Sequence, residues 1–477
     1  GAPGAPAATW HSWLKQGGAE GKITSGDLAT WVQLERGPIE GAGVWSHLYG
    51  RPDNAAFGGE TLGGASSATD LRVQWMGQPG PRAQADRNGR KPSPLAVGGR
   101  LFVQGLHRIA ALDAYNGTVL WGLEIPPLQR FNMPRDSSNW CADENHVFAA
   151  IKDRCWQVDA RTGHVARLHT VTAARGHQWS YDWGYLARAG GLLIGSAVKQ
   201  ESAFVSFWGK ADAGWYDARS GPATEKVCSD NLFALDPATG RQRWVYQDGV
   251  ILNSTITLAG GRAYFIECRH PAIRQSTRRR LGLPEIWKDQ HLVALDLNSG
   301  RKVLDEPIDT ADGTVVFYMA HGGGKLVIVS SGDKAYDVYA LDAATGKAAW
   351  HQRFDWPGGK GDHGKAMSRP AIVGDKLFVR PRVLNVRTGK DLGMRMPPGG
   401  CGTYAATAHA LVFRKGSIAV WNHDSDELSN WARLRPGCWL STVPAGGMLL
   451  APEAGGGCSC GSWMETSVGF IPRTAAP

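Results

Sequence analysis

The sequence of 477 residues lacks the patterns that would place it in a membrane or in several common enzyme classes. It contains no run of 18 or more apolar residues, so no transmembrane helix is expected. It also has no Walker loop, no G-x-S-x-G elbow, no H-E-x-x-H helix and no C-x-x-C-H haem attachment. These absences argue against a P-loop nucleotidase, an α/β-hydrolase, a zincin and a c-type cytochrome.

Acidic residues are fewer than basic ones, so the formal net charge is +9 at pH 7. The excess is partly local, in residues 82–91 and 269–280. Neither basic run has the interleaved aromatic residues that stack on nucleic-acid bases. We therefore expect solvated loops there and no nucleic-acid partner.

One short pattern recurs along the chain and is its most informative feature. The clearest copies are 111–117 followed by Trp121, 234–240 followed by Trp244, and 340–346 followed by Trp350, and looser copies occupy 158–163, 294–300 and 385–389. A repeated unit cannot bury its apolar face alone, so the copies are expected to stack on one another.

Each copy is predicted to form a strand, a turn and a returning strand. The Asp of the pattern can bond the backbone two residues on, and the Gly four positions later supplies a left-handed turn. The Trp is large enough to fill the wedge between neighbouring sheets. A further strand opened by Gly precedes several copies, at 98–103, 260–265 and 374–379. Four strands per unit predict the blade of a β-propeller.

The motif A-L-D-x-x-T-G-x-x-x-W resembles the repeat of the pyrroloquinoline-quinone-like, or quinoprotein-like, β-propellers. Residues 45–50, Asn54 and residues 71–75 resemble the opening segment of that family. The resemblance covers roughly residues 45–471. It implies the fold and leaves the cofactor open, because the family includes both quinone enzymes and scaffold propellers without a cofactor.

The turns predict an eight-bladed, all-β propeller of four-stranded blades over residues 45–477, with seven blades as the alternative. Six turns are marked by Asp113, Asp159, Asp236, Asp296, Asp342 and Asn385. A seventh blade is expected at 409–431. The eighth would pair 448–470 with 71–75, which closes the ring with both chain ends and removes free sheet edges. Residues 1–44 are predicted to be an extension with two short helices, the second beginning at Thr24.

Uneven spacing between the turns predicts insertions near 172–229 and 268–289. Long insertions in a repeat fold gather on one face, which is often the functional one. A metal site, of copper or calcium, would need side chains that converge from different blades, and the candidate ligands are His177, His321 and His363. His177, His363 and Asp362 are the candidate catalytic groups. The alternative for each histidine is a solvated or core side chain.

The candidate residues for binding a cofactor are Trp183, Arg435, Glu453, Cys458 and Cys460. Quinone-binding members of the family carry two adjacent cysteines whose ring stacks on the cofactor. This chain departs from that pattern, since it has no adjacent pair and offers only Cys458 and Cys460. Arg435 and Glu453 could instead form a structural ion pair.

Eight cysteines favour disulfides and an oxidising setting, and hence a periplasmic or extracellular protein. Cys141 with Cys155 and Cys228 with Cys268 are plausible pairs, whereas the pairing of the four C-terminal cysteines stays open.

Two functions follow from this reading. The first is an oxidoreductase with a metal or quinone site at the mouth of the central channel, acting on a small-molecule or carbohydrate substrate. The second is a non-catalytic scaffold or binding propeller without a cofactor, with a protein or carbohydrate partner. Exposed indoles such as Trp183 and Trp215 could stack on sugars in either case.

Overall fold

The computed structural model describes residues 7–17, 20–26, 29–34, 39–77, 92–105, 107–128, 138–176, 178–200, 202, 225–332, 335–355, 369–399, 402–434, 436–437, 440–452 and 466–473. The chain divides into two compact units, residues 1–40 and 41–477. The first contains helix α1 (Ala7–Gln16) and an antiparallel hairpin of β1 (Gly21–Ser25) and β2 (Thr30–Leu34). The second helix predicted at Thr24 is therefore wrong. The β-branched and aromatic residues on both sides of the turn favour strands, and this preference outweighs the helix-start signal.

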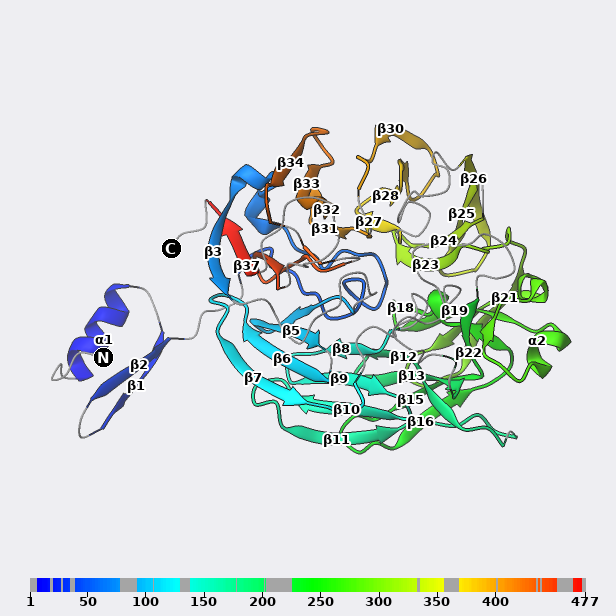
Figure 1. Cartoon of the computed structure of the whole chain (residues 1–477), viewed down its shortest axis with the longest axis horizontal. Coiled ribbons are helices and arrows are strands. Elements are labelled where there is room, and N and C mark those ends of the chain that lie inside the picture. Colours follow the sequence, from blue (N-terminus) through cyan, green and yellow to red (C-terminus); the bar gives the residue numbers. More distant parts are fainter. Residues whose placement is uncertain are drawn as a thin grey trace. The chain divides into compact units, whose positions relative to one another are not determined.

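The second unit is a ring of antiparallel sheets (Figure 1). Three four-stranded sheets come first in the chain, and their strands are β4 (Leu95–Val97), β5 (Arg100–Gly105), β6 (Arg108–Asp113) and β7 (Val119–Glu124); β8 (Trp140–Ala142), β9 (His146–Ile151), β10 (Arg154–Asp159) and β11 (Val165–Thr170); and β12 (Tyr181–Ala189), β13 (Leu192–Lys199), β15 (Asn231–Leu235) and β16 (Gln242–Tyr246).

Four further four-stranded sheets complete the regular set. They consist of β23 (Val316–Gly322), β24 (Lys325–Ser331), β25 (Ala335–Asp342) and β26 (Ala348–Asp355); β27 (Ala371–Val373), β28 (Lys376–Val379), β29 (Arg382–Asn385) and β30 (Asp391–Arg395); β31 (Ala405–Ala406), β32 (Ala410–Lys415), β33 (Ser417–Asn422) and β34 (Leu428–Trp431); and β35 (Val443–Ala445), β36 (Met448–Ala451), β37 (Ser467–Pro472) and β3 (Leu71–Gly77).

A seven-stranded sheet lies between the sheets of β16 and β23. It contains β14 (Lys226–Ser229), β17 (Val250–Leu252), β18 (Thr257–Ala259), β19 (Arg262–Cys268), β20 (Arg280–Leu281), β21 (Gln290–Asp296) and β22 (Lys302–Ile308). Short helices connect elements: α2 (Pro271–Gln275), η1 (Leu62–Gly64), η2 (Ala68–Asp70), η3 (Asn253–Thr255) and η4 (Pro284–Trp287). The predicted insertion at 268–289 thus holds α2, β20 and η4. The one at 172–229 holds β12, β13 and β14, and its residues 203–224 lie outside the described residues.

The predicted fold class is confirmed: the ring is an all-β propeller of four-stranded blades. Counting regular blades alone gives seven, the alternative count. The seven-stranded sheet occupies one further blade position in the ring. Within it, β18, β19, β21 and β22 pair in the order of the four strands of a blade. β3 pairs with β37, so the two ends of the ring's chain share one blade, as predicted.

The Trp of the repeat joins a blade to the next one at several places in the ring. The indole N–H of Trp121 donates to the carbonyl of Ala160 at 3.0 Å, and Trp244 donates to Leu297 at 2.8 Å. In both cases the acceptor follows the turn Asp of the neighbouring blade. The Gly of that turn lies against the indole, so Trp and Gly of adjacent repeats form one contact.

Candidate functional site

Residues 43–60, here called the inner loop, lie inside the ring and contact each sheet of the ring in turn (Figure 1). The loop's backbone, and in one case the ring of His47, bonds to the innermost strands in ring order: Ala96 in β4, Ala142 in β8, Arg188 in β12, Leu258 in β18, His321 in β23, Ile372 in β27, Ala406 in β31 and Gly446 after β35. The inner loop therefore occupies the space that an open channel would leave to solvent or to a cofactor.

The carboxylate of Glu60 joins the two ends of the inner loop. Its Oε2 accepts hydrogen bonds from the backbone N–H groups of Gly43 and Gly447, each at 2.9 Å. Its Oε1 accepts one from Leu62 at 2.7 Å. The side chain is fully buried, and three backbone donors compensate for the loss of water.

A small pocket lies between the inner loop and the surrounding strands. Its lining residues are His47, Leu48, Tyr49, Pro52, Asn54, Ser138, Tyr185, Asn253, Ile256 and Arg369. Asn54 has a left-handed backbone (φ 60°), and its amide donates to the carbonyl of Ile256 at 2.9 Å. This bond fixes the inner loop against the entry to β18 and gives the pocket one rigid wall.

Arg369 supplies the positive charge of the pocket. Its guanidinium lies 4.1 Å from the ring centre of Tyr49 and 4.2 Å from that of Tyr318, within the range of cation–π interactions. The residue is 6% exposed, and among the described residues its buried Nε and Nη1 atoms have no hydrogen-bond partner. Its Nη2 atom donates to the carbonyl of Ser254 at 3.5 Å.

Two titratable groups near Arg369, His47 and Tyr185, are uncharged at neutral pH. Burial, together with the nearby charge of Arg188, lowers the pKa of His47 to about 3, so its imidazole is neutral. Its Nε2 accepts a hydrogen bond from the backbone of Arg188 at 3.0 Å. Burial raises the pKa of the Tyr185 phenol, which stays protonated. Burial also raises the pKa of Asp53 to about 6.

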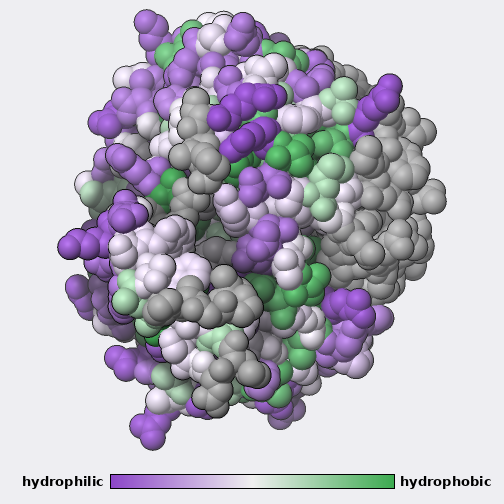
Figure 2. Space-filling model, turned by 90° about the vertical axis from the view of Figure 1, so that its left-hand side faces the viewer, coloured by the Kyte–Doolittle hydropathy of each residue, from purple (hydrophilic) through white to green (hydrophobic). Residues whose placement is uncertain are grey.

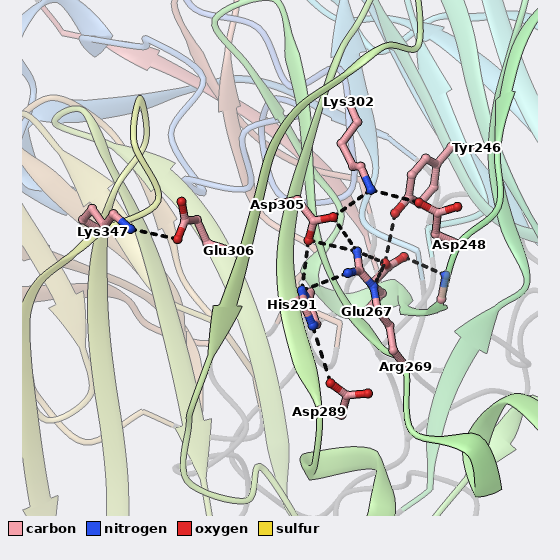
Figure 3. Close-up of polar contacts among 11 residues, drawn as sticks. Tyr246, Asp248, Glu267, Arg269, Asp289, His291, Lys302, Asp305, Glu306 and Lys347 are labelled. Carbon is pink, nitrogen blue, oxygen red and sulfur yellow. Dashed lines mark hydrogen bonds and ion pairs between the residues drawn. The ribbon is translucent and has the colours of Figure 1, made fainter.

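A second polar cluster lies in the seven-stranded sheet (Figure 3). Arg269 bonds both carboxylate oxygens of Asp305 at 2.9 Å and the Oε1 atom of Glu267 at 2.8 Å. Asp305 also accepts from His291 at 2.9 Å and from Lys302 at 2.7 Å. Because these charged groups bond one another, we interpret the cluster as structural, with no group left over for a ligand.

Only two of the predicted site residues lie in the described part of the chain. Trp183 is 2% exposed and packs edge-on against Phe233, with ring centres 5.0 Å apart, so its indole is a core group and offers no exposed face to a sugar. His321 is the penultimate residue of β23, stacks on Tyr264 and has a pKa lowered by burial. Outside the described residues lie His177, Asp362, His363, Arg435, Glu453, Cys458 and Cys460, together with Trp215.

The structure brings no predicted metal ligands together within the residues that it describes. Over those ranges no three His, Cys, Asp or Glu side chains are placed to hold one ion. The pocket residue Arg369 was missed, because a single Arg carries no motif. His47, Tyr49 and Asn54 were noticed only as parts of the family's opening segment.

The predicted disulfides of the N-terminal cysteines are wrong. Cys141 and Cys155 are buried thiols, and Cys228 is not joined to Cys268. The Sγ atom of Cys268 instead donates to the carbonyl of Lys288 at 3.2 Å. Buried thiols behave as small apolar groups, so these cysteines give no support to an oxidising compartment. Cys401, Cys438, Cys458 and Cys460 lie outside the described residues.

Residues 227–380 and 288–425 match the model of a PQQ-repeat family described as outer membrane protein assembly factor BamB. The repeats in this part of the chain are similar to those of the PQQ-like propellers, which is the resemblance that the turn motif predicted. A comparison with curated proteins gives no match.

Solved structures similar to this chain include BamB from Moraxella catarrhalis and a europium-containing methanol dehydrogenase. The first is 13% identical with a TM-score of 0.40, over 75% of this chain and 83% of that one. The second is 11% identical with a TM-score of 0.49, over 82% and 86%. Similarities of this size do not choose between a catalytic and a non-catalytic protein. No helix within the described ranges is long and apolar enough to cross a membrane.

Proposed function

We propose that this chain is a non-catalytic, extracytoplasmic binding propeller with a protein partner. The observation that carries the proposal is the inner loop, which fills the centre of the ring. Its side chains Trp45, Tyr49 and Ala56 are each at most 3% exposed, so the loop is packed as core. A quinone bound in the same space would have to displace a segment that hydrogen-bonds to every sheet.

The outer strands support a role in binding proteins. Three successive blades expose aliphatic side chains on their outermost strands, namely Val73 and Met76 on β3, Val119 and Leu120 on β7, and Val165 and Leu168 on β11. Exposed apolar groups that recur on neighbouring elements favour a docking surface. Figure 2 shows apolar patches between projecting hydrophilic side chains on one face of the molecule.

The proposal is tested by loading the purified full chain with pyrroloquinoline quinone and Ca²⁺. A binding propeller is expected to take up no quinone, to hold less than one equivalent of metal and to show no visible absorption. Stoichiometric quinone or tightly bound metal would contradict it. Binding of a protein partner is tested with the double variant Val119→Glu and Leu168→Glu. The variant should no longer bind the partner. Its melting temperature should be unchanged, since both side chains are exposed.

An oxidoreductase is the second candidate, and the pocket beside Arg369 is the observation that favours it. A buried cation with unpaired donors is a group that a redox enzyme can use to hold a substrate. The predicted copper, calcium or quinone site would then be built by His177, Asp362, His363, Arg435 and Glu453 with His321. Substitution of His363 by Ala should abolish dye-linked dehydrogenase activity if this proposal holds, and unchanged activity would reject that residue.

A further inference from the structure

The Trp that joins neighbouring blades is replaced in some copies of the repeat. This Trp lies four residues after the turn Gly, and the same position holds Arg167, Leu304 and Gly393 in three copies. Arg167 can still donate to the next blade, and it bonds the carbonyl of Ala238 in the neighbouring turn at 2.7 Å. Leu304 and Gly393 have no N–H group in their side chains. At these two junctions, the turn carbonyl that an indole bonds elsewhere needs a donor from another strand.

A cation on the second strand of the blade supplies the donor at both junctions. Arg262 begins β19 and donates to the carbonyl of Ala343 at 3.3 Å, where the phenol of Tyr264 adds a second bond at 3.0 Å. Lys376 begins β28 and donates to the carbonyl of His423 at 2.9 Å. Within the described residues, this carbonyl accepts from Lys376 alone. The junction between the sheets of β28 and β33 therefore relies on one lysine for this bond.

The lysine also contacts two groups that can change their charge. Its Nζ atom lies 3.2 Å from Nδ1 of His423 and 2.6 Å from Oδ1 of Asp424. The side chain of His423 is 3% exposed, and its ring packs against Phe378 with centres 5.1 Å apart. Because an ammonium group faces Nδ1, the neutral ring keeps its lone pair there and accepts from Lys376.

Protonation of His423 would remove this acceptor. It would place an N–H and a second positive charge 3.2 Å from the ammonium of Lys376. It would also leave N–H groups on both ring nitrogens, although Nε2 is buried without a partner among the described residues. Burial and the charge of Lys376 accordingly lower the pKa of His423 below its ordinary value of 6.5. The stabilisation from the neutral ring is complete above pH 6.5 and is lost as the pH falls below it.

The charged groups around the histidine compensate only in part. Oδ1 of Asp424 lies 3.3 Å from Nδ1 of His423, but this oxygen already accepts from Lys376. The bond from the lysine lowers the pKa of Asp424, so the carboxylate stays charged in mild acid. His409 lies 3.6 Å from the other oxygen of Asp424 and competes for the same carboxylate when it is charged.

The neighbouring pair next to Lys376 in the chain is already engaged. Asp375 accepts a hydrogen bond from Arg387 at 2.7 Å, and both residues belong to the same blade as the lysine. This pair therefore leaves the contact between Lys376 and His423 as the one that changes in mild acid.

We propose that Lys376, His423 and Asp424 form an acid-sensitive latch between the sheets of β28 and β33. At neutral pH, the lysine holds the turn of the next blade through a carbonyl, an imidazole and a carboxylate. In mild acid, the charged imidazole repels the ammonium, and the ring opens first at this junction. The latch does not depend on the proposed protein partner, because its three groups belong to one chain and their contacts form without a ligand.

Hydrogen exchange on the full chain tests the latch, at about pH 7.5 and about pH 5, after correction for the pH dependence of the exchange chemistry. The control strands are β5 and β6, whose blade is joined on both sides by an indole, Trp75 and Trp121. Between the two pH values, the protection of β28 and β33 should fall at least about tenfold more than that of the control strands. An equal fall in both places would overturn the proposal.

Two variants separate the latch from a merely structural bond. Lys376→Met should lower the protection of β33 at least about tenfold at about pH 7.5 and much less at about pH 5, where the wild-type latch is already weakened. Arg262→Met is the matched control, because Arg262 bonds carbonyl groups that do not titrate. It should lower the protection of β25 by the same factor at both pH values. An effect of Lys376→Met that does not change with pH would contradict the role of His423.

The titration of the His423 ring, followed by NMR on the wild-type chain, keeps the proposal testable if a variant does not fold. The ring should titrate below its ordinary pKa of 6.5, and at a higher pH in Lys376→Met. Titration of the wild-type ring at or above 6.5 would overturn the latch. Uptake of quinone would reject the binding-propeller proposal and leave this result intact.

Discussion

At the scale of single residues, burial decides how much each charged pair contributes. Figure 3 shows two pairs that differ in this respect. Arg269 bonds Glu267, which is fully buried, whereas Lys347 bonds Glu306 at 2.9 Å with 71% of the lysine side chain exposed. A buried carboxylate that loses its partner keeps the cost of desolvation, but an exposed one regains water.

Substitution of Arg269 by Met is therefore expected to lower the free energy of unfolding by about 3–5 kcal/mol. The change removes the partner of Glu267 and two hydrogen bonds to Asp305. Lys347→Met serves as the control and should cost about 0–1 kcal/mol. Denaturant unfolding of the two variants measures both values, and equal losses would show that burial does not set the difference.

Asp53 gives a dependence of stability on pH. Burial raises its folded pKa from 3.8 to about 6, so the native state favours the protonated carboxyl. The stabilisation from this proton is complete below the unfolded pKa of 3.8 and is lost as the pH rises through about 6.

Asp53→Asn mimics the protonated form and keeps an oxygen for the N–H of Ala55. We expect it to raise the free energy of unfolding by up to about 3 kcal/mol at about pH 7.5, and to have little effect at about pH 4. Unfolding curves at the two pH values measure the difference. Asp153→Asn replaces an exposed carboxylate and should not change the free energy of unfolding at either pH. A loss of stability for Asp53→Asn at the higher pH would contradict this account.

The candidate site was less predictable than the fold for a reason that lies at this scale. The repeat motif occupies a few consecutive residues, so it can be recognised directly in the sequence. Arg369, His47 and Tyr185 come from distant segments, and only the closed ring brings them to one pocket. Trp183 shows the converse error, since an aromatic residue in a predicted insertion was read as exposed although it packs against Phe233 within β12's sheet.

At the scale of elements, the contact between Trp and turn Gly is what makes neighbouring blades fit. An ideal Cβ on Gly163 would lie 2.8 Å from Cδ2 of Trp121, and Gly163 also has a left-handed backbone (φ 75°). Gly374 shares the left-handed backbone (φ 56°) but has no atom within 4 Å of an added Cβ. The two positions separate the cost of the backbone from the cost of the indole contact.

Gly374→Ala is expected to cost about 1–2 kcal/mol, from the left-handed backbone alone. Gly163→Ala should cost a further 1–3 kcal/mol or so, because the new methyl group overpacks the indole. The free energies of unfolding of the two variants provide the test. Equal costs would mean that the indole yields freely and does not hold the blades in place.

The motif predicted these elements because each copy carries its own turn and wedge. The N-terminal hairpin was mispredicted as a helix because the capping pattern at Thr24 was given more weight than the strand-favouring residues around it, and no copy of the repeat lies there. The seven-stranded sheet was seen only as a widened spacing, since its extra strands β14 and β20 carry no repeat motif.

At the scale of the whole molecule, both ends of the ring's chain close the structure. β3 and β37 share a blade, and the inner loop contacts all the sheets from inside. The sequence predicted the shared blade, because the expected strands at 71–75 and 448–470 had no partners within their own parts of the chain. It did not predict the circular path of the inner loop, because the partners of that loop are spread from Ala96 to Gly446.

Glu60→Gln is expected to destabilise the whole ring by about 1–3 kcal/mol. In the wild type, the carboxylate oxygens of Glu60 accept from the backbone N–H groups of Gly43, Leu62 and Gly447. In the variant, an NH₂ group replaces one of these oxygens, so a donor faces a backbone donor. Glu124→Gln applies the same change to a side chain that is 61% exposed and should have little effect. A cooperative shift of the whole transition is expected, and a separate early transition would show that the loop is only loosely attached.

Hydrogen exchange on the wild-type chain tests the central claim most directly. If the inner loop is part of the ring's core, the N–H groups of Ala142, His321 and Ala406, which donate to its carbonyls, exchange together and only by global unfolding. Slow exchange at these positions, matched to that of the central strands of the blades, is the predicted result. Rapid exchange there, with the blades still protected, would mean that the loop leaves an open channel.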